Sequence, residues 1–419
     1  MDIDLGNGVE TIEECRVCAS DDLSVVLDLG HTPIAYRLLD EAQLNDPEPH
    51  FPLQVALCHD CRLAQLKHAV NPQLLYPPDY PYDMETTQSA IDHFHSLASD
   101  AAEEAEMEAS DLAVDIGSST GVLLQGFEKA NTEVLGIEPA TEMADRAEAK
   151  GIETLSEFFD VDLAADIREQ YGPATIITAT NVINQIDDLP GFVDGIETLL
   201  AEGGMFVFET PHLVNTIEDL HYDHIYHEHS TYLSIEPIER LMAQQGMHIT
   251  RIEKVDFRGG SLRCYVGRED ETEKADNIDE IRAEERDLGI DDLQMWESFA
   301  GRVYHHRDQL NELVYSLKRD GHSIAAISVT AKGNSMLNFC GFSKHDFEFV
   351  TEIMDTKIGK YTPGGHIPIL HDDVLLEETP DYALIMAWNY ADTIIENLDD
   401  YQELGGKFIV PMPEPEIVE

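Results

Sequence analysis

The sequence predicts an α/β fold in which a central, mostly parallel sheet is preceded by a small β-rich module and followed by a second α/β domain. Short apolar runs such as DLAVDIG and TEVLGIE alternate with amphipathic helical stretches through the middle of the chain, which is typical of a parallel sheet with helices on both faces. The first residues instead combine prolines and cysteines with short alternating runs. A second alternation of strands and helices fills the last part of the chain.

The expected elements follow in chain order. The β-rich module holds strands in LSVVLDLG and FPLQVALC. The central domain holds a polar helix over 83–108, strands in DLAVDIG, TEVLGIE, ATIITAT, GMFVFET, HITRIEKV and SLRCYVGR, and helices over 141–150, 190–201 and 237–245. Residues 270–320 show helical periodicity with many charges, which predicts long connecting helices.

The last unit is expected to contain strands in HSIAAISVT, FEFVTEIMD, YALIMAW and GKFIVP, with one helix from Ala331 and another over 393–404. These elements divide the chain into a β-rich module, a central domain, connecting helices and a C-terminal α/β domain. The predicted boundaries are 1–82, 83–268, 269–320 and 321–419.

Acidic residues dominate the composition. The chain has 26 Lys plus Arg against 83 Asp plus Glu, which gives a formal charge of −57. Such a charge repels nucleic acids and anionic membranes, so neither is expected as a partner. We interpret the acids as a halophilic adaptation, because salt screening shortens the range of self-repulsion.

The N-terminus, MDIDLGNGVETIEEC, lacks the basic region and apolar core of a signal peptide, and no run approaches the roughly 20 apolar residues of a membrane span. We therefore expect a cytoplasmic protein. In that reducing compartment the six cysteines are expected to be metal ligands or core residues rather than disulfides.

Two CxxC pairs predict a zinc site. Cys15 and Cys18 form the first pair, and Cys58 and Cys61 form the second. A two-residue spacer lets each pair of thiolates bind one ion, and four thiolates complete a tetrahedral shell. Because that shell has no open position, we expect a structural Zn²⁺. The alternative is two pairs of buried thiols.

The stretch AVDIGSSTG predicts a cofactor turn. Its glycines stand between a strand and a helix, where a missing Cβ lets a ligand lie against the backbone. Glu138 ends the next predicted strand, where a carboxylate can hold both hydroxyls of a ribose. Asp115 precedes Gly117, and the turn lacks the glycine spacing of a dinucleotide site. These features favour S-adenosylmethionine, a cationic nucleoside without phosphates; the alternative is an ordinary tight turn beside a surface glutamate.

In their order along the chain these segments resemble the three-domain sugar C-methyltransferases. The resemblance covers nearly the whole chain and rests on the two CxxC pairs, YPPDYPY, DIGSSTGVLL, GIEPA, TNVINQIDDL, FETPHL, DHIYHEHSTYLS, FRGGSLR, AKGNSMLNFCGF, TPGGHIPI and AWNY. YHEH, GGSLR and AKGN are its specific parts. It implies a zinc-binding N-terminal domain, a Rossmann-like class I methyltransferase core and a C-terminal domain that binds a nucleotide-diphosphate sugar.

In that family the YHEH stretch closes over the sugar, so the resemblance implies that Tyr226, Glu228 and His229 are active-site groups. Alkylating a carbon needs a carbanion equivalent, and a C3 proton beside a C4 ketone is acidic enough for a side-chain base. A histidine with the ordinary pKa of about 6.5 suits that step. We expect His229 to be the base, Tyr226 its partner or the donor to the enolate, and Glu228 a contact to a sugar hydroxyl. A second metal site or a surface loop is the alternative.

The same motifs extend the expected site. The cofactor residues are expected to be Asp115, Gly117, Ser119, Gly121, Glu138, Asn181 and Gln185. Tyr80 and Tyr82 resemble tyrosines that reach the substrate, although they could instead pack the N-terminal module on the core. Substrate contacts are expected from Arg263, Lys332, Gly333, Asn334 and Lys360. For Arg263 and Lys360 a surface charge is the alternative.

Two departures from the family pattern matter. Gln185 stands where family members usually have a histidine, and an amide cannot take up a proton at neutral pH. The second departure is AAISVTAKGN, which lacks the usual glycine-rich turn. Lys332 at a helix start can still hold a phosphate, but crowding by Ser328 and Thr330 leaves the nucleotide undefined.

The sequence thus predicts an S-adenosylmethionine-dependent enzyme of deoxysugar biosynthesis, a monomer or homodimer that methylates C3 of a nucleotide-diphosphate-linked 4-keto-deoxysugar. The alternatives are methylation of another acceptor, such as a sugar oxygen, and a non-catalytic nucleotide-sugar-binding protein. The residues expected to hold the methyl donor and the expected base argue against the last, because a binding protein needs neither.

Overall fold

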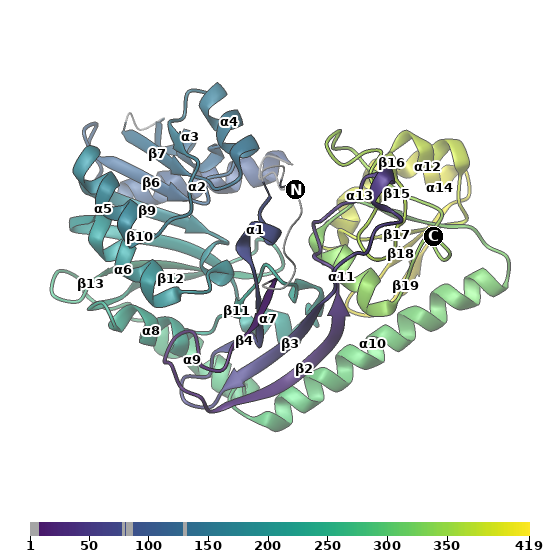
Figure 1. The fold of residues 1–419 in the computed structure, drawn as a ribbon, viewed down its shortest axis with the longest axis horizontal. Coiled ribbons are helices and arrows are strands. Elements are labelled where there is room, and N and C mark those ends of the chain that lie inside the picture. Colours follow the sequence, from purple (N-terminus) through teal and green to yellow (C-terminus); the bar gives the residue numbers. More distant parts are fainter. Residues whose placement is uncertain (1–7, 78–79, 81–86, 129–131) are drawn as a thin grey trace.

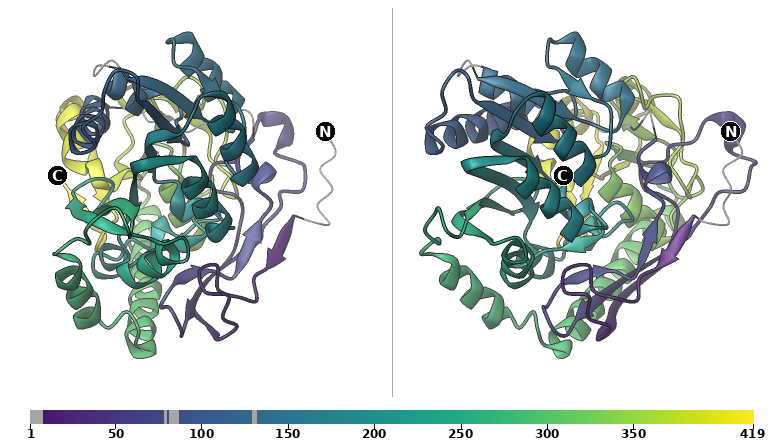
Figure 2. Two further views of the ribbon diagram at one scale, coloured as in Figure 1. Left: turned by 90° about the vertical axis from the view of Figure 1, so that its left-hand side faces the viewer. Right: turned by 60° about the vertical axis from the view of Figure 1, so that its left-hand side comes forward.

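The structure, a computed structural model, describes residues 8–77, 80, 87–128 and 132–419. This part of the chain forms two α/β lobes, which a curved antiparallel sheet and one long helix join along one side (Figure 1). Figure 2 shows that the curved sheet and the long helix stay side by side when the molecule is turned.

The first lobe is built on a seven-stranded sheet with the order β12-β13-β10-β9-β6-β7-β8. The strands from β10 to β8 in this order run parallel, and β13 runs antiparallel between β10 and β12. The bounds are β6 (Leu112–Ile116), β7 (Glu133–Ile137), β8 (Thr154–Leu155), β9 (Ala174–Thr180), β10 (Leu200–Pro211), β12 (Met247–Val255) and β13 (Ser261–Arg268). The predicted Rossmann-like core is confirmed.

Helices cover both faces of this sheet, as the sequence predicts. On one face the buried aromatic rings of Phe94 and Phe127 anchor two helices to the strands. These two helices are α2 (Gln88–Glu104) and α3 (Val122–Glu128). On the other face lie α5 (Val161–Gln170), α6 (Leu189–Leu199) and α8 (Ile235–Ala243). α4 (Thr141–Ala149) and α7 (Leu213–Glu218) complete the lobe, and α5 and β8 are additional to the predicted elements.

The N-terminal sheet is antiparallel and has the order β11-β4-β3-β2. β2 (Leu23–Thr32), β3 (Phe51–Cys58) and β4 (Ala64–Leu66) come from the β-rich module. β11 (Thr231–Tyr232) comes from the central domain, directly after the YHEH stretch. β1 (Val9–Thr11) and β5 (His68–Val70) form a separate pair, followed by α1 (Pro72–Leu75). The module is therefore completed by the strand that ends the predicted active-site loop.

Two helices connect the lobes, as the sequence predicts: α9 (Ile278–Leu288) and α10 (Leu293–Arg319). Asp292 caps α10 by accepting a hydrogen bond from the N–H of Gln294. The apolar side of α10 buries Trp296 and Phe299 in a core shared with β2 and the second lobe. None of the helices in the described ranges is both long and apolar enough to cross a bilayer.

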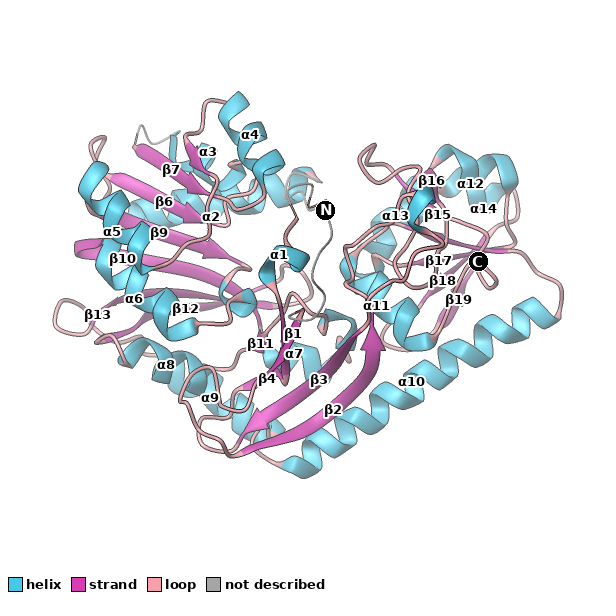
Figure 3. Ribbon diagram, in the orientation of Figure 1, coloured by secondary structure: helices cyan, strands magenta, loops and turns pink. Residues whose placement is uncertain are grey.

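The second lobe has a six-stranded sheet with the order β16-β15-β14-β17-β18-β19, parallel except for β19 (Figure 3). Its strands are β14 (Ile324–Ile327), β15 (Val350–Glu352), β16 (Ile369–His371), β17 (Tyr382–Ile385), β18 (Lys407–Val410) and β19 (Glu416–Val418). Its helices are α11 (Ala331–Cys340), α12 (Asp373–Glu378), α13 (Ala391–Asn397) and α14 (Asp399–Glu403). The helix predicted over 393–404 is thus divided in two at Leu398.

The segment between β2 and β3 reaches across to the second lobe. Leu39 forms a β-bridge with Tyr361. The carbonyl of Ala35 accepts a hydrogen bond from Asn334 Nδ2 at 2.8 Å. Glu48, in turn, accepts one from the N–H of Gly364 at 3.0 Å. The N-terminal module therefore contacts both lobes and fixes their relative position.

Candidate active site between the lobes

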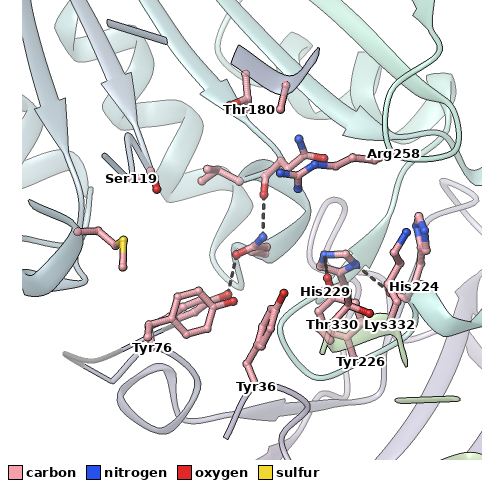
Figure 4. Close-up of a pocket in the computed structure, with 18 of the residues that line it drawn as sticks. Tyr36, Tyr76, Ser119, Thr180, His224, Tyr226, His229, Arg258, Thr330 and Lys332 are labelled. Carbon is pink, nitrogen blue, oxygen red and sulfur yellow. Dashed lines mark hydrogen bonds between the residues drawn. The ribbon is translucent and has the colours of Figure 1, made fainter. Parts of the chain in front are cut away.

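A cavity of about 1070 Å³ lies between the two lobes, at the carboxyl ends of the parallel strands of both sheets. Its walls come from the first lobe, the YHEH loop, the second lobe and tyrosines of the N-terminal module. Figure 4 shows Ser119 on one side, Lys332 on the other, and Tyr226 with His229 between them.

The four predicted zinc ligands lie together in the N-terminal module. The Sγ atoms of Cys15, Cys18, Cys58 and Cys61 all lie within 4.8 Å of one another. The Cys15–Cys61 and Cys18–Cys58 sulfur distances are 3.4 and 3.6 Å. Thiolates that share a tetrahedral Zn²⁺ at about 2.3 Å have separations of this order. The donor set therefore fits a structural zinc ion.

Arg16, inside the first CxxC pair, links the zinc module to the cavity. Its backbone N–H donates to Gln65 Oε1 at 2.9 Å, and its guanidinium donates to the carbonyl of Leu66 at 2.6 Å. The same guanidinium lies 2.9 Å from a carboxylate oxygen of Asp187, which lines the cavity. Arg16 therefore connects the first CxxC pair to the cavity wall through direct hydrogen bonds and an ion pair.

The lining residues between Ile116 and Asp187 form the part of the cavity that we call the cofactor half. The turn after β6 forms one of its walls. Gly117 has a φ of +71°, and a Cβ at this position would lie 2.5 Å from Val182 Cγ2, so only glycine fits. The N–H groups of Ser119 and Ala140 donate to the two carboxylate oxygens of Glu138, at 2.9 and 2.8 Å. These bonds hold the Glu138 carboxylate at the end of β7, and burial raises its pKa.

Asn181 lines the same half of the cavity, directly after β9. Its side chain is buried, and within the described structure neither its amide oxygen nor its amide nitrogen has a hydrogen-bond partner. Buried polar atoms are ordinarily paired, so a ligand can supply the missing partner. The described lining residues between Ile116 and Asp187 include no Lys or Arg. This half therefore fits S-adenosylmethionine better than a phosphorylated dinucleotide.

Two predicted cofactor residues lie behind the wall instead of on it. Asp115 is fully buried in β6 and accepts a hydrogen bond from Thr178 Oγ1 at 2.7 Å. Burial raises the pKa of Asp115 to about 7. Gly121 packs against Ile152, 3.1 Å from the position of an added Cβ. The structure places both residues as supports of the turn, outside the described cavity lining.

Tyr226 and His229 form a hydrogen-bonded pair on the cavity wall. His229 Nδ1 lies 2.8 Å from the carbonyl oxygen of His224, so Nδ1 carries the ring proton and donates it. Nε2 is then the acceptor, and it receives the hydroxyl of Tyr226 at 2.8 Å. Burial lowers the pKa of His229 to about 4, below the ordinary value assumed from the sequence. The imidazole is therefore neutral at pH 7, and Nε2 is its acceptor atom.

Glu228 lies beneath this pair. Its side chain is fully buried and stands outside the described cavity lining. Burial, and after it the charge of Glu228, raise the pKa values of Tyr76, Tyr80 and Tyr226. Burial also raises the pKa of Glu228 itself to about 7. The carboxyl therefore acts electrostatically on these three tyrosines, and its contact to a sugar hydroxyl stays a prediction.

Gln185, the departure from the family pattern, lines the cavity with both ends of its amide engaged. Its Nε2 donates to the carbonyl of Asn181 at 2.7 Å, and its Oε1 accepts from the hydroxyl of Tyr76 at 2.8 Å. Gln185 therefore orients Tyr76 and shapes the wall of the cofactor half.

The N-terminal module contributes a cluster of tyrosines to the cavity. Tyr80 lies edge-to-face against Tyr36 and Tyr76, with ring centroids 5.6 and 5.4 Å apart. Tyr82, the other tyrosine predicted from YPPDYPY, lies outside the described residues. Sequence reasoning missed Tyr36, which stands in none of the quoted motifs, and Tyr76, which opens YPPDYPY but was passed over for the other two tyrosines of that motif.

The second lobe contributes the start of α11. Thr330 caps this helix and accepts a hydrogen bond from the N–H of Gly333 at 3.0 Å. Lys332 lines the cavity; its Nζ donates to Asn389 Oδ1 at 3.0 Å and lies 5.2 Å from the ring centroid of Trp388. Burial lowers the pKa of Lys332 to about 8, so the ammonium stays mostly charged at neutral pH.

Gly333 and Asn334, both predicted substrate contacts, serve packing in this structure. A Cβ on Gly333 would lie 2.5 Å from atoms of Met386. Asn334 is fully buried and holds the N-terminal module through its bond to Ala35. Both residues stand outside the described cavity lining.

Two predicted substrate cations lie outside the described cavity lining, and two other cations line the cavity. Arg263 in β13 donates to the buried carboxylate of its cross-strand partner Glu209 at 2.7 Å. Lys360 stands outside the described lining, whereas Lys357 lines the cavity. Arg258, in the loop between β12 and β13, also lines it, and burial lowers its pKa. The glycine pair after Arg258 is the signal that could have identified this turn.

Fold and site together define an S-adenosylmethionine-dependent methyltransferase, and comparisons with known proteins agree. Family models match three successive parts of the chain: a zinc binding domain over 15–76, a methyltransferase domain over 88–252 and a C-methyltransferase C-terminal domain over 256–413. The C-methyltransferase NovU of Streptomyces niveus is 34% identical over 411 residues, which cover 98% of this chain and 98% of that protein.

Solved methyltransferase structures match about half of the chain. One is an S-adenosylmethionine-dependent methyltransferase from Clostridium acetobutylicum, with 15% identity, coverage of 45% of this chain and 93% of that chain, and a TM-score of 0.34. Another is the magnesium protoporphyrin IX methyltransferase of Synechocystis, with 14% identity, coverage of 46% and 88%, and a TM-score of 0.33.

The chain belongs to the C-methyltransferase family with a zinc-binding N-terminal domain, a methyltransferase core and a C-terminal C-methyltransferase domain. It is a zinc-binding, S-adenosylmethionine-dependent enzyme that methylates carbon. The two alternatives left open by the sequence, a non-catalytic binding protein and methylation at oxygen, do not agree with this membership.

Proposed function

We propose that the enzyme methylates C3 of a nucleotide-diphosphate-linked 4-keto-deoxysugar. The observation that carries this proposal is the hydrogen-bonded Tyr226–His229 pair, which lies between the cofactor half of the cavity and the half formed by the second lobe. Forming a bond at carbon requires loss of a C–H proton. A carbon beside a ketone gives up that proton to a side-chain base, and the neutral imidazole of His229 is such a base.

Two of the cations that line the cavity support a substrate with an anionic diphosphate. Arg258 and Lys332 both line it, although the chain has only 26 cations against 83 acids. Cations at a buried wall are suited to phosphate groups. The volume of about 1070 Å³ is large enough for a cofactor and a nucleotide sugar together.

The geometry of the pair supports a proton relay. Because the Tyr226 hydroxyl already occupies His229 Nε2, a substrate proton reaches the imidazole through Tyr226. As the C3–H bond breaks, the phenol oxygen takes that proton and passes its own proton to Nε2. The electron pair of the broken bond forms the C3–C4 double bond, and the ketone oxygen becomes an enolate. S-adenosylmethionine supplies an electrophilic methyl group when bound, and Ser119, Glu138 and Asn181 are the residues that would hold it.

Proton exchange tests this proposal without the methyl donor. A 4-keto nucleotide sugar incubated with the enzyme in heavy water is expected to gain deuterium at C3. His229→Ala should slow the exchange about 100-fold or more and leave S-adenosylmethionine affinity nearly unchanged. Tyr226→Phe should slow it as strongly if the relay operates, and less if the phenol only stabilises the enolate.

His248→Gln serves as the control, because His248 lies in β12 and bonds to Thr272 Oγ1 outside the cavity lining. It should exchange at the wild-type rate. Undiminished exchange in both the His229 and the Tyr226 variants would contradict the assignment of the base.

A further inference from the structure

His224 is a cavity residue that the mechanism above leaves without a role. It ends a short 3-10 turn, Tyr222–His224, and its side chain is 4% exposed on the cavity wall. Neither ring nitrogen has a hydrogen-bond partner within the described structure. Buried polar nitrogens are ordinarily paired. An unpaired imidazole at this wall therefore indicates a ligand atom as its partner.

The neighbours of His224 fix its place and its protonation state. Its ring stacks on His221 with centroids 5.3 Å apart, and its own carbonyl accepts the bond from His229 Nδ1 at 2.8 Å. Figure 4 places its side chain beside Lys332. Burial first, and then the charge of Lys332, lower the pKa of His224 well below its ordinary value. The ring is therefore neutral, with one N–H to donate.

We propose that His224 and Lys332 together form the oxyanion site of the reaction, donating hydrogen bonds to the C4 oxygen of the substrate. This inference rests on the proposed function. When the Tyr226–His229 pair takes the C3 proton, the electron pair of the C–H bond moves toward C4, and the former carbonyl oxygen gains negative charge. C4 is bonded to C3, so its oxygen must lie close to the base.

The structure supplies donors at that place. The hydrogen bond that His229 Nδ1 donates to the carbonyl oxygen of His224 holds the two residues together, and Lys332 stands beside His224. Fixed donors aimed at an oxygen that becomes charged stabilise the transition state more than the ketone. A neutral imidazole suits this work because it donates a hydrogen bond without giving up its proton.

Substitutions of His224 test the inference through C3 deuterium exchange at saturating nucleotide sugar. His224→Leu should slow the exchange about 100-fold and change the dissociation constant of the nucleotide sugar little. His224→Gln, which retains an N–H donor, should recover much of the rate. His248→Leu is the control for the same substitution, because His248 lies in β12, bonds to Thr272 Oγ1 and stands outside the described lining of this cavity; its exchange rate should stay near that of wild type.

Melting curves and S-adenosylmethionine affinity show whether each variant is folded. If His224→Leu does not fold, His224→Phe keeps an aromatic ring against His221, lacks the N–H donor and carries the same expectation. Wild-type exchange in either variant would overturn the inference, as would a loss of substrate affinity as large as the loss of rate. Absence of C3 exchange in the wild-type enzyme would overturn both the proposed function and this inference. If the His229 and Tyr226 variants lose exchange but the His224 variants keep it, only this inference is overturned.

Discussion

At the scale of single residues, the buried Glu228 affects the stability of the protein as well as the pKa values of the cavity tyrosines. Its ordinary pKa is 4.5, and burial raises the pKa to about 7 in the folded protein. Between these pH values the folded protein holds a proton that the unfolded chain has lost. The contribution of Glu228 to stability is therefore complete below about pH 4.5 and is lost as the pH rises through 7.

Glu228→Gln is expected to stabilise the protein at pH 8 and to change little at pH 5, because an amide does not ionise. A pKa shift from 4.5 to about 7 corresponds to about 3 kcal/mol at alkaline pH. Melting curves at both pH values in the same molar salt measure the effect. The exposed Glu297→Gln is the control for the general loss of one negative charge. Equal effects of Glu228→Gln at both pH values would contradict this account.

The residues of FRGGSLR show how far sequence reasoning reaches at this scale. The sequence predicts Arg263 as a substrate contact, whereas the structure places Arg258 on the cavity lining. Both are arginines in one short motif, and their roles depend on the strand register. That register places Arg263 opposite Glu209. The motif around Tyr226 and His229 was more informative, because its residues are neighbours in the chain and therefore in space.

At the scale of elements, β11 connects the zinc module to the active site. It follows the YHEH loop and pairs with β4, which itself lies close after the second CxxC pair. The carbonyl of Ser230 also accepts the N–H of Leu66. The loop that carries Tyr226 and His229 is therefore held in part by a sheet whose other strands belong to the zinc-binding domain.

Removing zinc is expected to lower both the melting temperature and the rate of C3 exchange, although none of the four cysteines stands in the described cavity lining. A chelator titration at fixed salt measures zinc content, melting temperature and exchange together. Readdition of zinc is the control and should restore both properties. Zinc-free protein with unchanged stability and exchange would contradict the connection through β11.

Sequence reasoning predicted the elements whose pattern is local. The strands of the central sheet and the long helix α10 follow from apolar periodicity. The pairing of β11 with β4 could not be predicted, because Thr231 and Gln65 are distant in sequence and two residues carry no strand signal. Likewise, the break of the last predicted helix at Leu398 has no glycine or proline to mark it in the sequence.

At the scale of the whole molecule, the charge of −57 is the dominant property. We expect the melting temperature to rise with potassium chloride up to molar concentration, because screening weakens the repulsion among acids. Melting curves across a salt series measure this. A sucrose series is the comparison, since sucrose stabilises by exclusion from the protein surface without screening charge; the salt effect is expected to be the larger. A flat response to salt would mean that the acids are compensated locally and that the halophilic interpretation is wrong.

The whole molecule also brings together residues from every part of the chain. The cavity combines Tyr76 of the N-terminal module, Glu138 and His229 of the first lobe, and Lys332 of the second. This assembly explains why no single segment predicts the substrate. In the reaction that we propose, the first lobe holds the methyl donor, the second lobe holds the nucleotide, and the loop between them removes the proton.

The position of the new methyl group tests this account most directly. The enzyme would be incubated with a nucleotide-diphosphate 4-keto-deoxysugar and S-adenosylmethionine labelled with ¹³C in its methyl group, and the product followed by NMR. The predicted result is a labelled methyl carbon bonded to C3 of the sugar, with loss of the C3 proton. A labelled methyl group on an oxygen, or no transfer to any 4-keto nucleotide sugar, would contradict it.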